Sequence, residues 1–486
     1  METKVGKSDW LFLIICILLG ILAEEVFFRG EIGISYFLFI TAFYAVFFWR
    51  FRNINFSHQR FGYLVISCIW LLSACFFLNG NKLFYGLNFM VIPCLVTFHL
   101  VMVTSPKNLK WNQPVFVSYL FTRLFEALKY NFAFAALFGK GLKQGVNESK
   151  FLIWKKVMIG IVISIPVLFV ILNLLMKADT QFERMVGGFP QWFQVFDAES
   201  IARVVIIFIY SFGFFGFLQI LIKKHMNVFP QQTSNHMLRQ VDAVIAITVL
   251  VLINVVYLLF TVVQFKYFFG GSLGDLTYAE YARKGFFELL FVTLINLSIS
   301  IFVLTFVNRV TNGITRSIQI LLTILVLASA VMLCSAFMRL GLYEDAYGFT
   351  FTRVLVHSFM IFLVIIFTYT LVKIWVDKLS LFHFYFISSL LYYTAISVIN
   401  LDNIVVKQNM VRYEASGKID VYYLSRMSYT GVLGLIDLYE KEGDIPGLQT
   451  ILQDKKNEAL SSSYSWQSYN LKREQAYEKL KQLDLK

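Results

Sequence analysis

The chain has 486 residues, of which 58% are hydrophobic and 15% are charged. Soluble domains contain about 45–50% apolar and 25% charged residues, so this composition excludes a water-soluble globular protein and a disordered chain. The formal net charge is +13. We attribute it to cytoplasmic loops of a membrane protein rather than to nucleic-acid binding, because basic residues collect in such loops.

Long apolar runs divide most of the chain into candidate membrane helices. A spanning helix needs about 20 mostly apolar residues to cross roughly 30 Å of hydrocarbon. The runs predict an all-α, polytopic integral membrane protein with about eleven transmembrane helices, and the first is expected to be an uncleaved anchor. The predicted spans are 10–28, 33–49, 61–78, 83–103, 157–176, 201–222, 241–264, 286–308, 317–337, 353–374 and 380–399.

Residues 114–146 are apolar but carry a polar stripe, which predicts an interfacial amphipathic helix rather than a span. Ser118, Thr122, Glu126 and Lys129 recur at steps of three and four residues, and such a stripe suits a helix lying in the membrane surface. A transmembrane crossing of this segment is the alternative. It would move the later basic loops to the outer side.

The distribution of basic residues between alternate loops predicts the orientation. One set of loops carries 21 Lys and Arg residues and the other carries 8, and the richer set is expected to lie in the cytoplasm. The N-terminus is therefore predicted inside. With eleven spans, the C-terminus is predicted to be extracytoplasmic.

The composition changes at residue 400, which predicts two domains. Residues 1–399 form the transmembrane domain, and residues 400–486 form a small soluble tail with 12 basic and 12 acidic residues. Three helices are expected in the tail, over 428–441, 446–459 and 466–482, because turn-forming residues separate them.

The sequence predicts no catalytic residues, no metal site and no cofactor. Glu24, Glu25 and Arg29 have the order EExxxR, which resembles the first motif of membrane-embedded glutamate-dependent prenyl-protein proteases. The FxxxH and HxxxN/D histidine patterns of those enzymes do not occur. We therefore interpret the three residues as the outer end of the first span, within reach of water.

Two polar loops on the predicted outer side form a candidate binding cluster. Thr277 and Glu280 have the spacing of a helix capping box, but the aromatic and charged residues around them lack such an explanation. Glu288 lies slightly inside an apolar run, where a carboxylate requires a partner. No histidine lies in either loop, so no acid–base group active at neutral pH is expected. The predicted cluster comprises Tyr278, Glu280, Tyr281, Arg283, Glu288, Arg339, Tyr343, Glu344, Tyr347 and Arg353.

Three stretches together resemble a known family: LAEEVFFRGEIGISYFLF, FGGSLGDLTYAEYARKGFFEL and RLGLYEDAYGFTFTR. They are similar to the bacterial membrane proteins grouped as domain of unknown function 4173, related to the 4153 group. The tail adds Asn400, Asp402 and Arg412, then Asp420, Tyr423 and Leu424, which look like the family's N-x-D and D-x-x-Y-L patterns. The stretch SRMSYTGVL lacks the acidic residue usual after the serine. The resemblance implies a bacterial plasma membrane but no reaction.

The expected function is a non-enzymatic binding, scaffold or signalling component of the cell envelope, working on the extracytoplasmic side. The expected partners are the lipid bilayer and an envelope protein or lipid-linked ligand, with no nucleic acid. A transporter or flippase using Glu288 or Glu24 as an intramembrane charge is the alternative. A membrane-embedded transferase or hydrolase is a third hypothesis.

Overall fold

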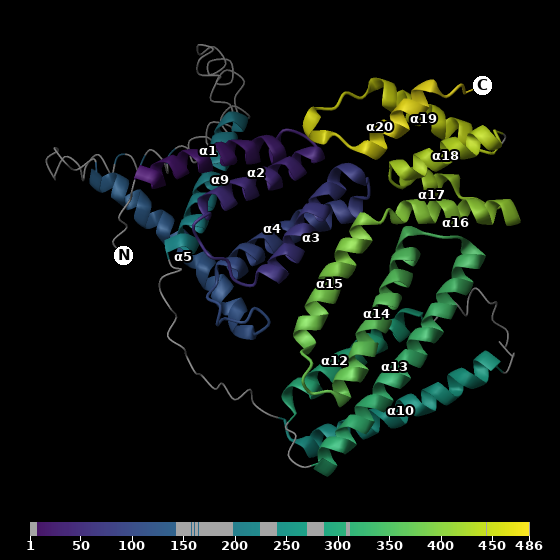
Figure 1. Ribbon diagram of the computed structural model, residues 1–486. Coiled ribbons are helices and arrows are strands. Elements are labelled where there is room, and N and C mark those ends of the chain that lie inside the picture. The colour runs from purple at the N-terminus through teal and green to yellow at the C-terminus, as the bar shows by residue number, and fades with distance from the viewer. Residues whose placement is uncertain are drawn as a thin grey trace. The chain divides into compact units, whose positions relative to one another are not determined.

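The computed structural model describes residues 7–141, 198–223, 241–269, 286–307, 312–443 and 445–485, with three isolated positions between 157 and 164. Every named element in these ranges is a helix (Figure 1). The only β-type pairing described there is an isolated bridge between Val241 and Val307. The all-helical class predicted from the sequence is therefore confirmed.

Apolar helices account for most of the described chain because each backbone polar group is satisfied within its own helix, as a bilayer requires. They are α1 (Lys7–Phe28), α2 (Ile34–Arg50), α3 (Gln59–Leu78), α4 (Lys82–Thr104), α5 (Pro114–Gly141), α9 (Ala198–Lys223), α10 (Ala243–Phe269), α12 (Phe286–Phe306), α13 (Asn312–Tyr347), α14 (Phe351–Trp375) and α15 (Leu381–Val398).

Nine helices of the described part of the chain are long and apolar enough to cross a membrane. Helix α2 is apolar but shorter, with 17 residues. The exact number of eleven spans stays a prediction, because only three isolated positions of the predicted span 157–176 are described. Helix α5 is not among the nine, and its placement in the membrane surface also stays a prediction.

The first compact unit contains residues 1–74, 91–228 and 465–469. Within it α1 crosses α9 closely: a Cβ added at Gly20 would lie 2.8 Å from the Ile207 carbonyl oxygen. Small residues permit such close helix approaches in membranes. Asp9 of α1 accepts hydrogen bonds from Arg50 of α2 and Gln219 of α9, each at 2.8 Å. These contacts fix three helices to one another.

Helix α5 belongs to the first unit and packs against α9. The Asn131 amide donates to the Phe212 carbonyl at 2.8 Å. Arg123 is buried, and its guanidinium donates to Glu126 at 3.0 Å and to the Tyr119 hydroxyl at 2.9 Å. Part of the polar stripe predicted for this helix is therefore satisfied within the helix itself.

The second compact unit contains residues 75–90, 229–464 and 470–486. Its apolar core lies around α13, against α10, α12 and α14. With 36 residues, α13 is about 54 Å long, which exceeds the roughly 30 Å hydrocarbon layer. The expectation of an outer loop between the predicted spans 317–337 and 353–374 was wrong: α13 continues to Tyr347, and only residues 348–350 separate it from α14.

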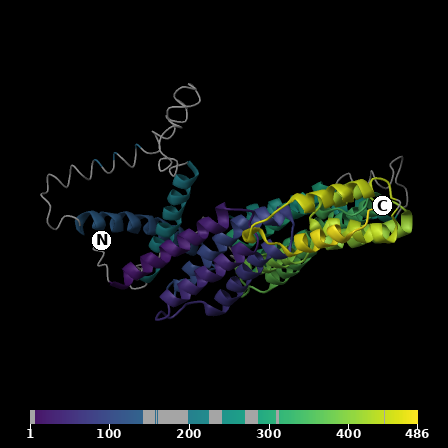
Figure 2. The same cartoon turned by 90° about the horizontal axis from the view of Figure 1, so that it is seen from above.

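The tail forms α16 (Leu401–Ser416), α17 (Val421–Arg426), α18 (Tyr429–Lys441), α19 (Leu448–Ser461), the 3₁₀ helix η2 (Trp466–Ser468) and α20 (Leu471–Gln482). Leu435, Leu448, Leu452 and Leu480 are completely buried in its core. Seen from above, the tail helices lie over the ends of the membrane helices of the second unit (Figure 2). The sequence predicted the region of α18 to α20 as helical but missed α16 and α17.

Candidate functional site

Helix α16 binds the short connection between α13 and α14. In Figure 1 it lies across the ends of these two helices. The Asn409 amide donates to the Phe349 carbonyl at 2.8 Å, and its oxygen accepts from the Phe349 N–H at 3.2 Å. Arg412 donates to the Ala346 carbonyl at 3.0 Å. Gly348 has φ +84°, and a Cβ there would meet Asn409. The connection is thus held by main-chain hydrogen bonds to tail side chains.

The residues of the two tail patterns act at this same junction. Asp420 caps α17 by accepting from the Tyr423 N–H at 2.8 Å. The Tyr423 hydroxyl then accepts from the Phe351 N–H at 2.8 Å, in the first turn of α14. Burial raises the pKa of Tyr423, so the hydroxyl stays neutral. The patterns found in the sequence are therefore structural links between the tail and the membrane helices.

Asp402 is a buried carboxylate at the centre of the junction, with only 3% of its surface exposed. It accepts hydrogen bonds from the Asn81 amide, at 3.1 Å, and from the Ser428 hydroxyl. The Asn81 oxygen in turn accepts from the Leu83 N–H at the start of α4, at 3.0 Å. Burial raises the pKa of Asp402, and the hydrogen bonds from Ser428 and Asn81 oppose that rise. The carboxylate links α4, α16 and α18.

Two further asparagines complete this group of contacts. Asn400 caps α16 and donates to the Thr430 hydroxyl at 2.9 Å. Asn470, next to η2, donates to the carbonyls of Phe76 and Asn79 at 3.0 Å each. We name Asn81, Asn400, Asp402, Asn409, Tyr423, Ser428 and Asn470 together the tail junction.

The members of the predicted cluster on α13 and α14 lie close together. The Arg353 guanidinium stacks on the Tyr343 ring at 4.2 Å and donates to the Gly348 carbonyl. The Tyr347 ring lies 4.9 Å from the Tyr343 ring and is exposed, whereas Arg339 is buried. These side chains belong to helices and not to a loop.

Glu344, another member, is buried and pairs with a histidine that the sequence did not associate with it. Its Oε2 lies 3.0 Å from His357 Nδ1, while His357 Nε2 lies 3.4 Å from the Phe337 carbonyl. The expectation that no acid–base group lies in this region was therefore wrong. His357 lies nearly two turns inside α14, and only the packing of α13 against α14 brings it near Glu344.

In the described part of the chain, no contact joins the remaining members of the predicted binding cluster to the side chains on α13 and α14. Glu288 is exposed in the first turn of α12. Tyr278, Glu280, Tyr281 and Arg283 lie outside the described residues. A binding cluster that unites both predicted loops thus stays a prediction.

Glu24 and Glu25 form a second polar group, in the first unit. Glu24 is 2% exposed and lies 3.5 Å from both Arg29 and Arg203. Glu25 pairs with Arg29 at 2.8 Å and accepts from the Gln467 amide at 2.6 Å. Glu24 is therefore an internal ion-pair partner rather than a water-exposed end of the span, and sequence reasoning did not reveal its partner on α9.

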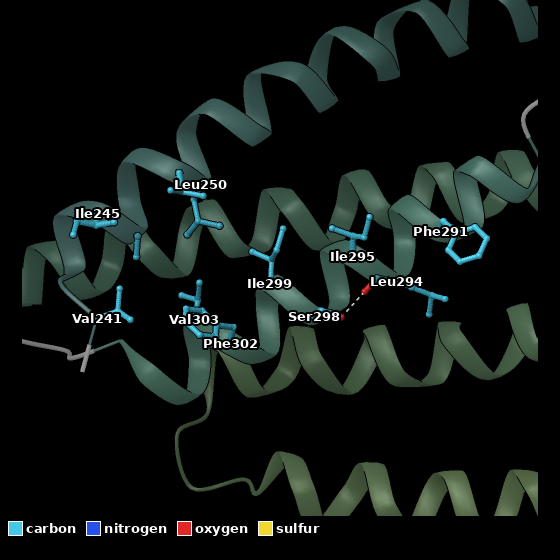
Figure 3. Close-up of a pocket in the computed structure, with 12 residues that line it drawn as sticks. Val241, Ile245, Leu250, Phe291, Leu294, Ile295, Ser298, Ile299, Phe302 and Val303 are labelled. Carbon is cyan, nitrogen blue, oxygen red and sulfur yellow. Dashed lines mark hydrogen bonds between the residues drawn. The ribbon is translucent and has the colours of Figure 1, made fainter. Parts of the chain in front are cut away.

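An apolar groove of about 530 Å³ lies between α10 and α12 (Figure 3). Leu250, Ile295 and Phe302 are among its lining residues, and the Ser298 hydroxyl donates to its own helix at Leu294. The groove therefore offers no polar group for recognition or catalysis. No set of three or more metal-ligating side chains is found in the part of the chain that the structure describes.

The fold and these contacts define a helical multi-pass membrane protein whose polar residues join a tail to the membrane helices. A family model described as Domain of unknown function (DUF4153) matches residues 66–438, so the chain belongs to this family. The predicted relation to the 4153 group is confirmed, whereas the 4173 grouping is not. No curated protein and no solved structure matches the chain.

Proposed function

We propose that this protein is a non-enzymatic binding or scaffold component of a bacterial plasma membrane, with its working face on the extracytoplasmic side. That face would consist of the tail helices and the connections that they bind. The observation that carries the proposal is the tail junction, because its polar side chains bond the tail to the membrane helices of the second unit. A preorganised surface of this kind favours binding.

The contacts of the tail support one particular orientation. Gln467 contacts Glu25 at the end of α1, Asn470 contacts the connection after α3, and Asn409 contacts the connection after α13. Gln467 and Asn470 are too close in the chain to lie on opposite sides of roughly 30 Å of hydrocarbon. The tail then shares the side reached after the first span, opposite the N-terminus.

This orientation also bears on the number of crossings. If α2 and the nine apolar helices all cross, an odd total requires one more crossing outside them. The span predicted at 157–176 supplies it when α5 lies in the membrane surface. The excess of basic residues in the other set of loops supports an extracytoplasmic tail.

The use of polar side chains favours binding over catalysis. Two buried carboxylates of the second unit already have partners. Asp402 bonds to Asn81 and Ser428, and Glu344 pairs with His357. A hydrolase or transferase requires such groups to converge on a space that admits substrate. The large groove is apolar instead, so the described carboxylates support a structural role.

Accessibility labelling tests the orientation. In a variant without the native cysteines, single cysteines replace Tyr347 and Val411, which are exposed on α13 and α16, or Arg52 after α2. A membrane-impermeant maleimide applied to intact cells should label the first two positions, and should label Arg52→Cys only after permeabilisation. The reverse pattern would refute an extracytoplasmic face.

Photo-crosslinking tests the binding role. A photoreactive amino acid at the exposed Val411 or Tyr422 of the tail should give discrete adducts with an envelope protein or a lipid-linked ligand in living cells. The same group at exposed Leu252 of α10 is the matched control, for which we expect only membrane-lipid adducts. Equal adduct patterns at all three positions would contradict a binding face on the tail.

A further inference from the structure

The short helix η2 is seated on the connection between α1 and α2. The Ile34 N–H donates to the Tyr469 carbonyl at 3.2 Å, and Gln467 donates to Glu25 at 2.6 Å. A Cβ at Gly33 would lie 2.4 Å from the Tyr469 carbonyl oxygen, so the two backbones approach as closely as a glycine allows. All these residues belong to the first compact unit.

The lengths of the flanking helices indicate the depth of this seat in the membrane. Helix α1 has 22 residues, or about 33 Å, which matches the thickness of the hydrocarbon layer. Its C-terminal end and the start of α2 therefore lie close to the boundary between hydrocarbon and headgroups. Because η2 binds the residues between these two ends, it lies at the same depth.

The side chains that η2 and its neighbours expose have the composition of a membrane interface. Trp466 is 50% exposed and Tyr469 is 39% exposed. Phe28 and Arg29, on the adjoining end of α1, are also exposed. Trp and Tyr concentrate at headgroup level because their rings are apolar and their N–H or O–H groups bond to water and lipid.

We propose that Trp466 and Tyr469 insert into the headgroup region of the bilayer and fasten the tail to the membrane surface. The ligand is the lipid surface itself, in whichever leaflet faces the tail, so the proposal does not depend on the orientation proposed above. The tail would then be held twice: by the tail junction within the second unit and by lipid at η2.

Fluorine NMR of the full-length protein, labelled with fluorotryptophan in phosphatidylcholine nanodiscs, tests this proposal. The Trp466 resonance is assigned by its loss in a Trp466→Phe variant. Spectra are recorded with lipids that carry a nitroxide on the headgroup or near the end of the acyl chain, and with a water-soluble paramagnetic agent. Trp70, exposed in the middle of α3, and the buried Trp111 are internal controls.

The proposal expects the headgroup nitroxide to broaden Trp466 more strongly than the acyl-chain nitroxide does, with the reverse order for Trp70. Broadening of Trp466 by the water-soluble agent alone would show a ring in bulk water and would overturn the proposal. A Trp466 resonance as insensitive to all three agents as that of Trp111 would show protein coverage, by a second copy or a partner, and would equally overturn it.

Discussion

Replacing Asp402 by Ala should loosen the tail on the membrane helices. The change removes a buried carboxylate that accepts two hydrogen bonds. The donors of these bonds, the Asn81 amide and the Ser428 hydroxyl, then lose their acceptor. A buried donor that loses its acceptor costs about 1–3 kcal/mol, and removal of a carboxylate whose own burial is unfavourable offsets part of that cost. We expect a net loss of about 2 kcal/mol in the local opening free energy, equivalent to roughly 30-fold faster exchange.

Hydrogen exchange measured by mass spectrometry on the protein in nanodiscs can detect this change in peptides that cover 401–409, because amide exchange reports local opening. Asp437→Ala is the matched control: its carboxylate makes an exposed ion pair with Lys479 at 2.8 Å, worth no more than about 1 kcal/mol. Asp402→Asn keeps an acceptor and should give an intermediate rate. Unchanged exchange of 401–409 in Asp402→Ala would refute the reasoning that this carboxylate holds the junction.

Three further results are expected from the same exchange measurement. Because burial raises the pKa of Asp402, its contribution to stability is full below the unfolded-state pKa near ~4 and is lost as the pH rises through the folded value. After correction for the pH dependence of intrinsic amide exchange rates, the junction should open more readily at neutral than at acidic pH, and Asp402→Asn should flatten this dependence. A junction stability that rises with pH in the wild type, but not in Asp402→Asn, would contradict the raised pKa of Asp402. Asn409→Ala loses hydrogen bonds to Phe349 at 2.8 and 3.2 Å and should destabilise residues 346–351 by about 2 kcal/mol, whereas the exposed Asn403→Ala should change little; equal effects would argue against the contact. Gly33→Ala should release residues 465–469, because the added Cβ meets the Tyr469 backbone. Gly30→Ala is the control, because the nearest atom there is the rotatable Ser465 hydroxyl, at 2.8 Å. Protection of 465–469 that survives Gly33→Ala would show that η2 binds elsewhere.

Much of the helical architecture could be predicted from the sequence because a helix that crosses lipid satisfies its own backbone and needs a long apolar run. The run 83–103 became α4 and the run 353–374 became α14 almost unchanged. The predicted helix boundaries were wrong where a helix continued into polar sequence: α13 passes Arg339 and Glu344 and ends at Tyr347. Hydropathy indicates where lipid ends but not where a helix ends.

The candidate site was less accessible to sequence reasoning. Asp402 and Tyr423 were found through the patterns of a family, yet their partners Asn81 and Phe351 carry no signal of their own. His357 was a scattered polar residue in an apolar run until α14 packed against α13 and placed it beside Glu344.

The amino-acid sequence by itself determined that this protein is a helical membrane protein, because apolar content and run length act locally along the chain. Only the tertiary structure decided which polar residues meet. Gln467 and Glu25 are 442 positions apart in the sequence, and their contact depends on how η2 folds back onto the end of α1 within the first unit. Such pairings arise from tertiary packing within a compact unit, which no local pattern of residues encodes.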